Sequence, residues 1–249
     1  MRNEAPSRSL SRRSNQVKTL ALLLAAVGVF VTALGVLGAA LPLVYAADPS
    51  YGLYVFAYNL ALVVGIGLLI VAVALAIRAF TWKTDNDLAM ITGRFLADTQ
   101  VLDDRFDLIR NVSKREIGYV DAVLVGPPGV LVFRILDTEG SFANDGANWL
   151  RVKPTNESVP ASINPTREAI ADIQKVREFL DKHNLPAIPV YGVVVFVKDE
   201  QRVHLSAREP VVPPTHLKNI VLNLQPNFLA KDRIDQPTVE AIRRLLMNE

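Results

Sequence analysis

The sequence predicts an α/β protein in which two N-terminal transmembrane helices precede one mixed-sheet domain flanked by helices. Two long apolar runs lie before residue 83 of the 249-residue chain, and hydrophobic residues make up 50% of the whole. After these runs, short apolar segments with strand or helix periodicity alternate with turns that contain glycine and proline. About 165 residues follow the runs, which is enough for one self-supporting core. We therefore expect a single soluble domain over residues 84–249.

The two apolar runs have the length of transmembrane helices. The first covers residues 20–46 without a charge, and the second covers residues 53–80 with no charge before Arg78. Both exceed the roughly 20 apolar residues that a helix needs to cross the hydrocarbon core. We expect a transmembrane hairpin over residues 19–82, with the lipid bilayer as a partner, after a basic cytoplasmic segment of residues 1–18.

Charge predicts how this hairpin is oriented. Basic residues precede the first run and follow the second, whereas the turn of residues 47–52 has no lysine or arginine. The positive-inside rule then places both flanks and the soluble domain in the cytoplasm, and we expect a bacterial inner (plasma) membrane. A cleaved signal peptide is the alternative for the first run, because its start is basic and it ends in Val44, Tyr45 and Ala46.

Small residues form a seam along each apolar run. They are Ala21, Ala25, Gly28, Thr32, Gly35 and Ala39 in the first run, and Ala57, Ala61, Gly65, Ala72 and Ala76 in the second. Small residues at steps of three and four allow helices to approach closely in lipid. The seams predict tight packing within the hairpin or a homo-oligomer.

The soluble segment has the pattern of a helix, three or four meandering strands, a helix, two strands and a last helix. The first helix is expected from Thr84, whose spacing to Asp87 resembles a capping box. The expected strands cover residues 106–112, 119–125, 130–136, 149–152, 190–197 and 220–222, with a loop at 140–146, and the later helices follow Pro165 and Pro237. This order predicts a mixed sheet with helices on its faces.

One ordered set of motifs resembles a known family. An apolar strand with an acidic residue precedes a Gly-Pro-Pro-Gly turn and a second apolar strand, between Gly118 and Phe133. The chain resembles the NERD (nuclease-related) domain, which is similar to restriction-endonuclease-like nucleases. The matching features, in order, are Asp121, Gly126, Pro127, Gly129, Gly140, Trp149, Asn164, Pro165 and the strand 190–197. The resemblance extends over residues 90–200.

The catalytic part of the family pattern is largely replaced in this chain. Asp121 remains, whereas Arg134 and Leu136 stand at the positions of the family's Glu and Lys, and Glu168 stands at the position of its Gln. The resemblance implies that active relatives hold Mg²⁺ between two carboxylates, while the lysine helps to polarise the attacking water. Loss of one carboxylate and of the lysine predicts a catalytically inactive domain without a cofactor.

Strand geometry predicts what Arg134 does instead. If Val125 pairs with Val130 across the turn, Asp121 lies directly opposite Arg134 on the same sheet face, with Cβ atoms about 5 Å apart. A guanidinium can pair with this carboxylate through two parallel hydrogen bonds and so replace the metal. The alternative is that Arg134 is an exposed strand residue that points away from Asp121.

Other acidic residues could supply a metal site by another arrangement. A site of Asp121, Asp137 and Glu139 would bind Mg²⁺ and make the chain a metal-dependent nuclease, and Asp103 and Asp104 lie upstream. Acidic residues beside a glycine are more often turn formers. The chain has no cysteine, and its three histidines show no ligand spacing, so a Cys- or His-based metal centre is not expected.

Three functions are compatible with these patterns. The first is a membrane-anchored, non-catalytic nuclease-related domain that serves as an interaction or scaffold module. The second is the metal-dependent nuclease with a rearranged site, and the third is an α/β module whose resemblance is accidental. Nucleic acid is a doubtful partner, because the segment after Lys83 carries an acidic excess. A protein partner cannot be named from the sequence.

Overall fold

The computed structural model describes residues 1–6, 10–41, 43–185, 187–226 and 228–247, with the side chains of the first helix from Ser14 onward. It divides into two compact units. One unit is Leu10–Thr84, and the other joins Met1–Ser9 to Asp85–Glu249. Residues 1–6, expected in a separate basic segment of residues 1–18, therefore lie in the same compact unit as the residues that follow Thr84.

The first unit contains α1 (Leu10–Ala40) and the first part of α2 (Tyr51–Asp98). Both helices are long and apolar enough to cross a membrane. The helix expected to continue to residue 46 ends at Ala40, because Leu41 precedes a proline and the residue before proline is disfavoured in the α region.

No separate helix begins at Thr84, which is a second correction to the expected elements. α2 continues through this position, and the Thr84 hydroxyl donates to the Phe80 carbonyl inside the helix instead of capping an N-terminus. A threonine inside a helix commonly bonds the carbonyl four residues earlier. The spacing of Thr84 to Asp87 therefore matched a capping box without being one.

The two helices of the hairpin approach closely through the small-residue seams. A Cβ atom placed on Gly65 would lie 2.6 Å from the Thr32 backbone nitrogen, and one on Gly35 would lie 2.8 Å from Leu62. These separations are below van der Waals contact, so only glycine fits. The predicted tight packing within the hairpin is confirmed, while the predicted homo-oligomer stays a prediction.

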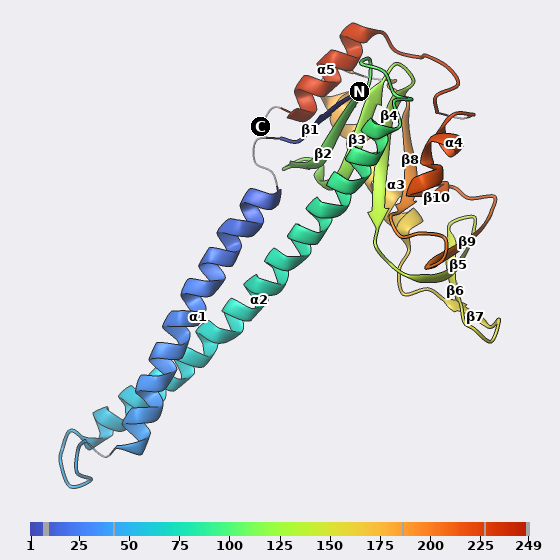
Figure 1. Ribbon diagram of the computed structural model, residues 1–249. Coiled ribbons are helices and arrows are strands. Elements are labelled where there is room, and N and C mark those ends of the chain that lie inside the picture. The colour runs from blue at the N-terminus through green and yellow to red at the C-terminus, as the bar shows by residue number, and fades with distance from the viewer. Residues whose placement is uncertain (7–9, 42, 186, 227, 248–249) are drawn as a thin grey trace. The chain divides into compact units, whose positions relative to one another are not determined.

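The soluble unit contains two sheets (Figure 1). The six-stranded sheet has the order β1-β2-β3-β4-β8-β10, and the four-stranded sheet has the order β7-β6-β5-β9. The strands of the first are β1 (Arg2–Glu4), β2 (Asp107–Lys114), β3 (Gly118–Gly126), β4 (Gly129–Leu136), β8 (Val190–Phe196) and β10 (Pro214–His216). Those of the second are β5 (Gly140–Asp145), β6 (Asn148–Val152), β7 (Ser158–Pro160) and β9 (Val203–Arg208).

Helices cover both faces of the six-stranded sheet. They are α3 (Pro165–Lys182), α5 (Gln236–Met247), α4 (Ile220–Leu224) after a short 3₁₀ turn at Leu217–Asn219, and the last turns of α2. Val123 of β3 packs in one core with side chains of α3 and α5. Leu124, the next residue, packs in the opposite core with side chains of α2 and α4. This alternation is that of a strand buried on both faces, and it confirms the predicted α/β class.

Two expected elements are wrong in type. Residues 140–146, expected as a loop, form β5, in which Phe142 and Asn144 are buried and alternate with outward residues. Residues 220–222, expected as a strand, begin α4, in which the buried residues Ile220 and Leu224 stand four apart. A run of three apolar residues does not distinguish the two periods, and the helix is chosen by what it packs against.

The strand β1 was not expected from the sequence. Arg2 pairs with Asp107 in a parallel register, and its guanidinium binds both oxygens of that carboxylate at 2.5 and 2.8 Å. Asp107 is 1% exposed. Glu4 is held by Arg243 of α5 at 2.7 Å. Residues 2–4 of the expected basic N-terminal segment thus form an edge strand of the domain.

Candidate functional site

The candidate site is built on the β3–β4 hairpin. Val125 pairs with Val130 and Gly126 with Gly129, so the turn itself fixes the register of the two strands. Gly129 has a φ of +126°, a conformation that residues other than glycine rarely adopt. This register places Asp121 opposite Arg134, as the sequence predicts.

Arg134 bridges two carboxylates instead of binding one. Its Nη1 atom lies 3.6 Å from Asp121 Oδ2, and its Nη2 atom forms an ion pair with Glu168 Oε2. The predicted Asp121–Arg134 pair is therefore confirmed, but the expected two-bond geometry is wrong, because the two ends of the guanidinium separate. Asp121 Oδ2 also accepts a hydrogen bond of 2.8 Å from the Ile135 amide.

The helix α3 brings Glu168 to this pair. Asn164 caps the helix by accepting a 3.0 Å hydrogen bond from the Arg167 amide, and Pro165 occupies the first turn, as expected. Glu168 follows in the same first turn. Leu136, at the position of the family's lysine, instead packs on the aromatic core that contains Trp149. The structure therefore joins Asp121, Arg134 and Glu168 but leaves Leu136 outside the ionic cluster.

Further ionisable groups lie in this cluster, although the sequence reading did not assign them to it. Asp172 is 7% exposed, and its Oδ1 lies 3.3 Å from Lys175 Nζ. Asp85 of α2 adds to the burial that raises the pKa of Asp121, and burial together with Asp121 and Asp85 raises the pKa of Tyr119 of β3. The Lys175 side chain is exposed, whereas that of Asp172 is buried. Its spacing of four from Glu168 was the missed signal, since residues four apart share one helix face.

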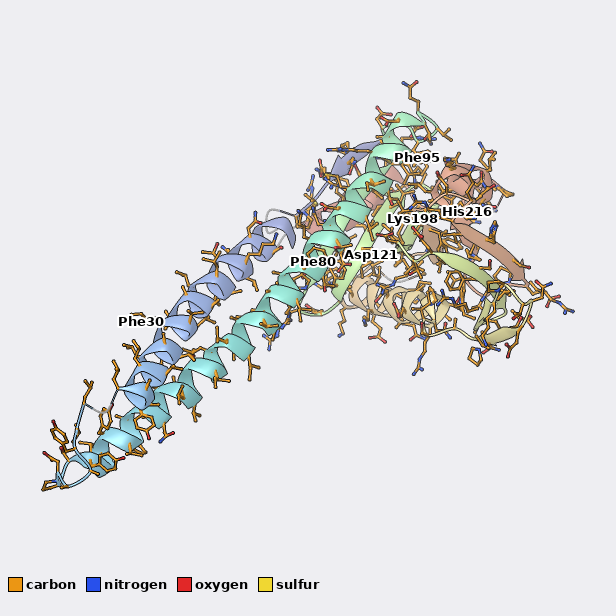
Figure 2. The ribbon with its side chains drawn as sticks, turned by 60° about the horizontal axis from the view of Figure 1, so that its bottom comes forward. Phe30, Phe80, Phe95, Asp121, Lys198 and His216 are labelled. Atoms are coloured by element: carbon orange, nitrogen blue, oxygen red, sulfur yellow. The ribbon has the colours of Figure 1, made fainter. Side chains whose placement is uncertain are left out.

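Burial sets the ionisation of Asp121. Its side chain is 7% exposed, and this loss of hydration raises its pKa to about 6, although Arg134 and the Ile135 amide both favour the charged form. Figure 2 labels Asp121 on β3. A carboxylate with this pKa changes charge just below neutral pH.

Arg134 keeps its charge in spite of partial burial. Its burial would lower its pKa, but Asp121, Glu168 and Asp172 together raise the pKa above the ordinary value. The Nε atom is buried and has no acceptor. The guanidinium therefore stays a fixed cation that faces several carboxylates.

Residues 90–197 match the family model of the nuclease-related domain, NERD. The chain carries a nuclease-related domain. The matched range agrees with the range of 90–200 expected from the sequence motifs. No curated protein and no solved structure matches the chain.

The resemblance to active nucleases implies a divalent metal ion at this site. The residues present here do not fit such an ion. Donor groups of Arg134 occupy the space between Asp121 and Glu168, where a cation would need acceptor oxygens. Among the residues that the structure describes, no three His, Cys, Asp or Glu side chains are grouped so that they could hold a metal ion. No catalytic step through a metal is derived for this site.

Three of the other acids considered from the sequence, Asp103, Asp137 and Glu139, lie beside basic side chains. Asp137 and Glu139 lie 3.3 and 3.7 Å from Lys198 Nζ, which Figure 2 labels, and Glu139 also lies 3.0 Å from Arg202. Asp103, upstream, pairs with Arg105 at 2.8 Å. The proposed grouping of Asp137 and Glu139 with Asp121 is not formed.

Proposed function

We propose that this chain is a membrane-anchored nuclease-related domain that does not cut nucleic acid and serves as an interaction or scaffold module. The observation that carries the proposal is the Arg134 guanidinium between the Asp121 and Glu168 carboxylates. A fixed positive charge there repels a divalent cation at the distance where a ligand oxygen should attract it. Without that cation, and with Leu136 at the lysine position, water has no activating group.

Membrane anchoring by a two-helix hairpin is supported by the place of β1. Arg2–Glu4 lie in the same compact unit as Asp85–Glu249, so both ends of the hairpin join one domain. A domain cannot be split across a bilayer, so both ends lie on the same side. Cleavage after the first helix would also remove β1 and leave Asp107 without Arg2, which argues against a signal peptide. The basic flanks favour the cytoplasmic side of a bacterial inner membrane.

The proposal is tested with the full-length chain in detergent, incubated with supercoiled plasmid and Mg²⁺ or Mn²⁺. We expect no cleavage by the wild-type chain. The matched control is Asp121→Ala, which removes the remaining acidic residue of the family pattern. Plasmid cleavage by the wild type that disappears in Asp121→Ala would overturn the proposal.

A restored site provides the positive control. Arg134→Glu combined with Leu136→Lys returns both family residues to β4, and we expect this variant to bind Mn²⁺ in calorimetry. Metal binding by the double variant and not by the wild type supports a site that has lost its metal through these two positions. Equal metal binding by both proteins contradicts it.

The second candidate is a metal-dependent nuclease with a rearranged site. The observation in its favour is that Asp121, Glu168 and Asp172 all act on Arg134, with Lys175 beside Asp172. These carboxylates and the lysine are residue types of a hydrolytic site, although the Arg134 side chain would have to move away from the carboxylates. Cleavage in the plasmid assay that is lost in both Asp121→Ala and Asp172→Asn would favour this candidate.

A further inference from the structure

A cavity of about 550 Å³ lies in the soluble domain between β8, α3, α4 and the segment of residues 210–213. Apolar side chains make up most of its walls, among them Ile173, Tyr191, Val211 and Leu224. This volume and lining are those of ligand sites, which are mostly apolar with a few placed polar groups. The cavity shares no residue with the Arg134 cluster.

One wall of the cavity is an open strand edge. β10 pairs with β8 only from Val194 onward, and the Val194 amide donates to the Pro213 carbonyl at 3.1 Å. Backbone groups on a strand alternate in direction, so Gly192, two residues earlier, also turns its N–H and C=O away from β4 and toward this side. Gly192 lines the cavity.

Pro213 prevents the β8–β10 hydrogen-bond ladder from extending to Gly192. In the parallel register, the Gly192 carbonyl would accept from residue 213, which is a proline and has no N–H. In the same register the Gly192 amide would donate to the Val211 carbonyl, and among the described residues this hydrogen bond is not formed; the Val211 amide itself donates to the Gly146 carbonyl at 3.3 Å. Within the described ranges, the backbone of Gly192 therefore has no strand partner on the cavity side.

The rim of the cavity exposes apolar side chains and one cation. Val211 is 60% exposed, and Leu222, next to the lining residue Asn223, is 69% exposed. Arg177 of α3 lines the cavity, and its Nη2 atom donates a long 3.5 Å hydrogen bond to the Val190 carbonyl. Arg177 makes no salt bridge within the part of the chain that the structure describes, so its charge is free to meet an acidic group.

We propose that this cavity binds an extended peptide segment that adds as a strand to the open edge of β8. A donor and an acceptor on one residue, both facing the same side, match a peptide group and leave no polar atom unpaired. Apolar side chains of the segment fill the cavity, and a carboxylate meets Arg177. Such strand addition takes its affinity from main-chain hydrogen bonds and its specificity from side-chain pockets. The site supplies a surface for the proposed interaction module but does not depend on the domain being inactive.

Binding is tested on the full-length chain in detergent with a dye-labelled peptide of sequence Thr-Val-Thr-Val-Thr-Asp. We expect saturable binding in fluorescence anisotropy. Arg177→Glu should weaken it about fivefold, since an exposed ion pair contributes up to about 1 kcal/mol. A peptide that ends in an amidated lysine should prefer Arg177→Glu over the wild type. This exchange of charges separates a lost contact from a misfolded variant.

Two controls make the test specific. Arg167→Glu makes the same change on an exposed residue of α3 outside the cavity, and it should leave peptide binding unchanged. A peptide with proline in place of the second valine lacks one main-chain donor and should not bind. The proposal is overturned by the absence of saturable binding up to about 1 mM, by equal binding of the proline peptide, or by equal effects of Arg167→Glu and Arg177→Glu.

Discussion

Neutralising Asp121 should change how the stability of the domain depends on pH. The pKa of its carboxyl group is about 6 in the folded chain, against 3.8 in the unfolded chain. Between these values the folded state holds a proton that the unfolded state has lost, so stability falls as pH rises from about 4 to 6. The difference of about two pKa units corresponds to about 3 kcal/mol. Asp121→Asn removes this loss, and its advantage over the wild type should grow with pH.

The measurement is thermal unfolding of the full-length chain in detergent, followed by circular dichroism at acidic and neutral pH. For a domain of this size, 3 kcal/mol shifts the Tm by about 6–12 °C. The Tm of the wild type should fall relative to that of Asp121→Asn by this amount between pH values of about 4 and 7. Asp104→Asn, at an exposed aspartate of the same domain, controls for the chemical change. A Tm difference that stays constant over this range, or that changes in the opposite direction, would refute the reasoning.

Three further predictions concern the N-terminal strand, the hairpin and its orientation. Arg2→Ala should destabilise the soluble domain by about 3 kcal/mol in thermal unfolding, because it leaves the buried Asp107 carboxylate without its closest partner. Gly65→Leu should separate the two hairpin helices and lower their melting temperature, since a Cβ atom would lie 2.6 Å from the Thr32 backbone nitrogen. Ala47→Cys, in the turn, should react with a membrane-impermeant maleimide added outside intact cells.

Each of these predictions has a matched control. Arg105→Ala removes an exposed ion pair and should cost less than about 1 kcal/mol. Gly67→Leu adds the same side chain where no atom lies within 4 Å, and it should not separate the helices. Lys231→Cys, in the soluble domain, should stay unlabelled until the cells are opened. Equal results for a control and its test variant would contradict the feature that the variant tests: the Arg2–Asp107 ion pair, the close contact of the two helices, or the orientation of the hairpin.

The pair of Asp121 and Arg134 could be predicted because the information for it is local. The Gly126–Gly129 turn fixes the register of β3 and β4, and the distance of each residue from the turn then places the two side chains opposite each other. The second ion pair of the Arg134 guanidinium, with Glu168, could not be predicted in the same way. It depends on how α3 packs across the sheet, which no spacing in the sequence contains.

Two of the missed strands, β1 and β10, share one physical reason. β1 and β10 have three residues each, and neither shows an apolar alternation. β1 is polar throughout and becomes a strand through the ion pairs of Arg2 and Glu4 with residues far along the chain. β10 follows Pro213 and is fixed by its pairing with β8. Short edge strands of this kind are decided by tertiary contacts, which override local preference.

Under the proposed membrane anchoring, the position of β1 would tie the completion of the domain to correct membrane insertion. Arg2 is synthesised first, but the carboxylate that it neutralises, Asp107, follows only after both apolar helices have left the ribosome. A molecule that inserted a single span would leave the two on opposite sides of the bilayer, and the buried Asp107 carboxylate would lose its closest cation. Under the proposed membrane anchoring, such misoriented copies would be less stable and more readily degraded, and the edge strand would act as a check on topology during biogenesis.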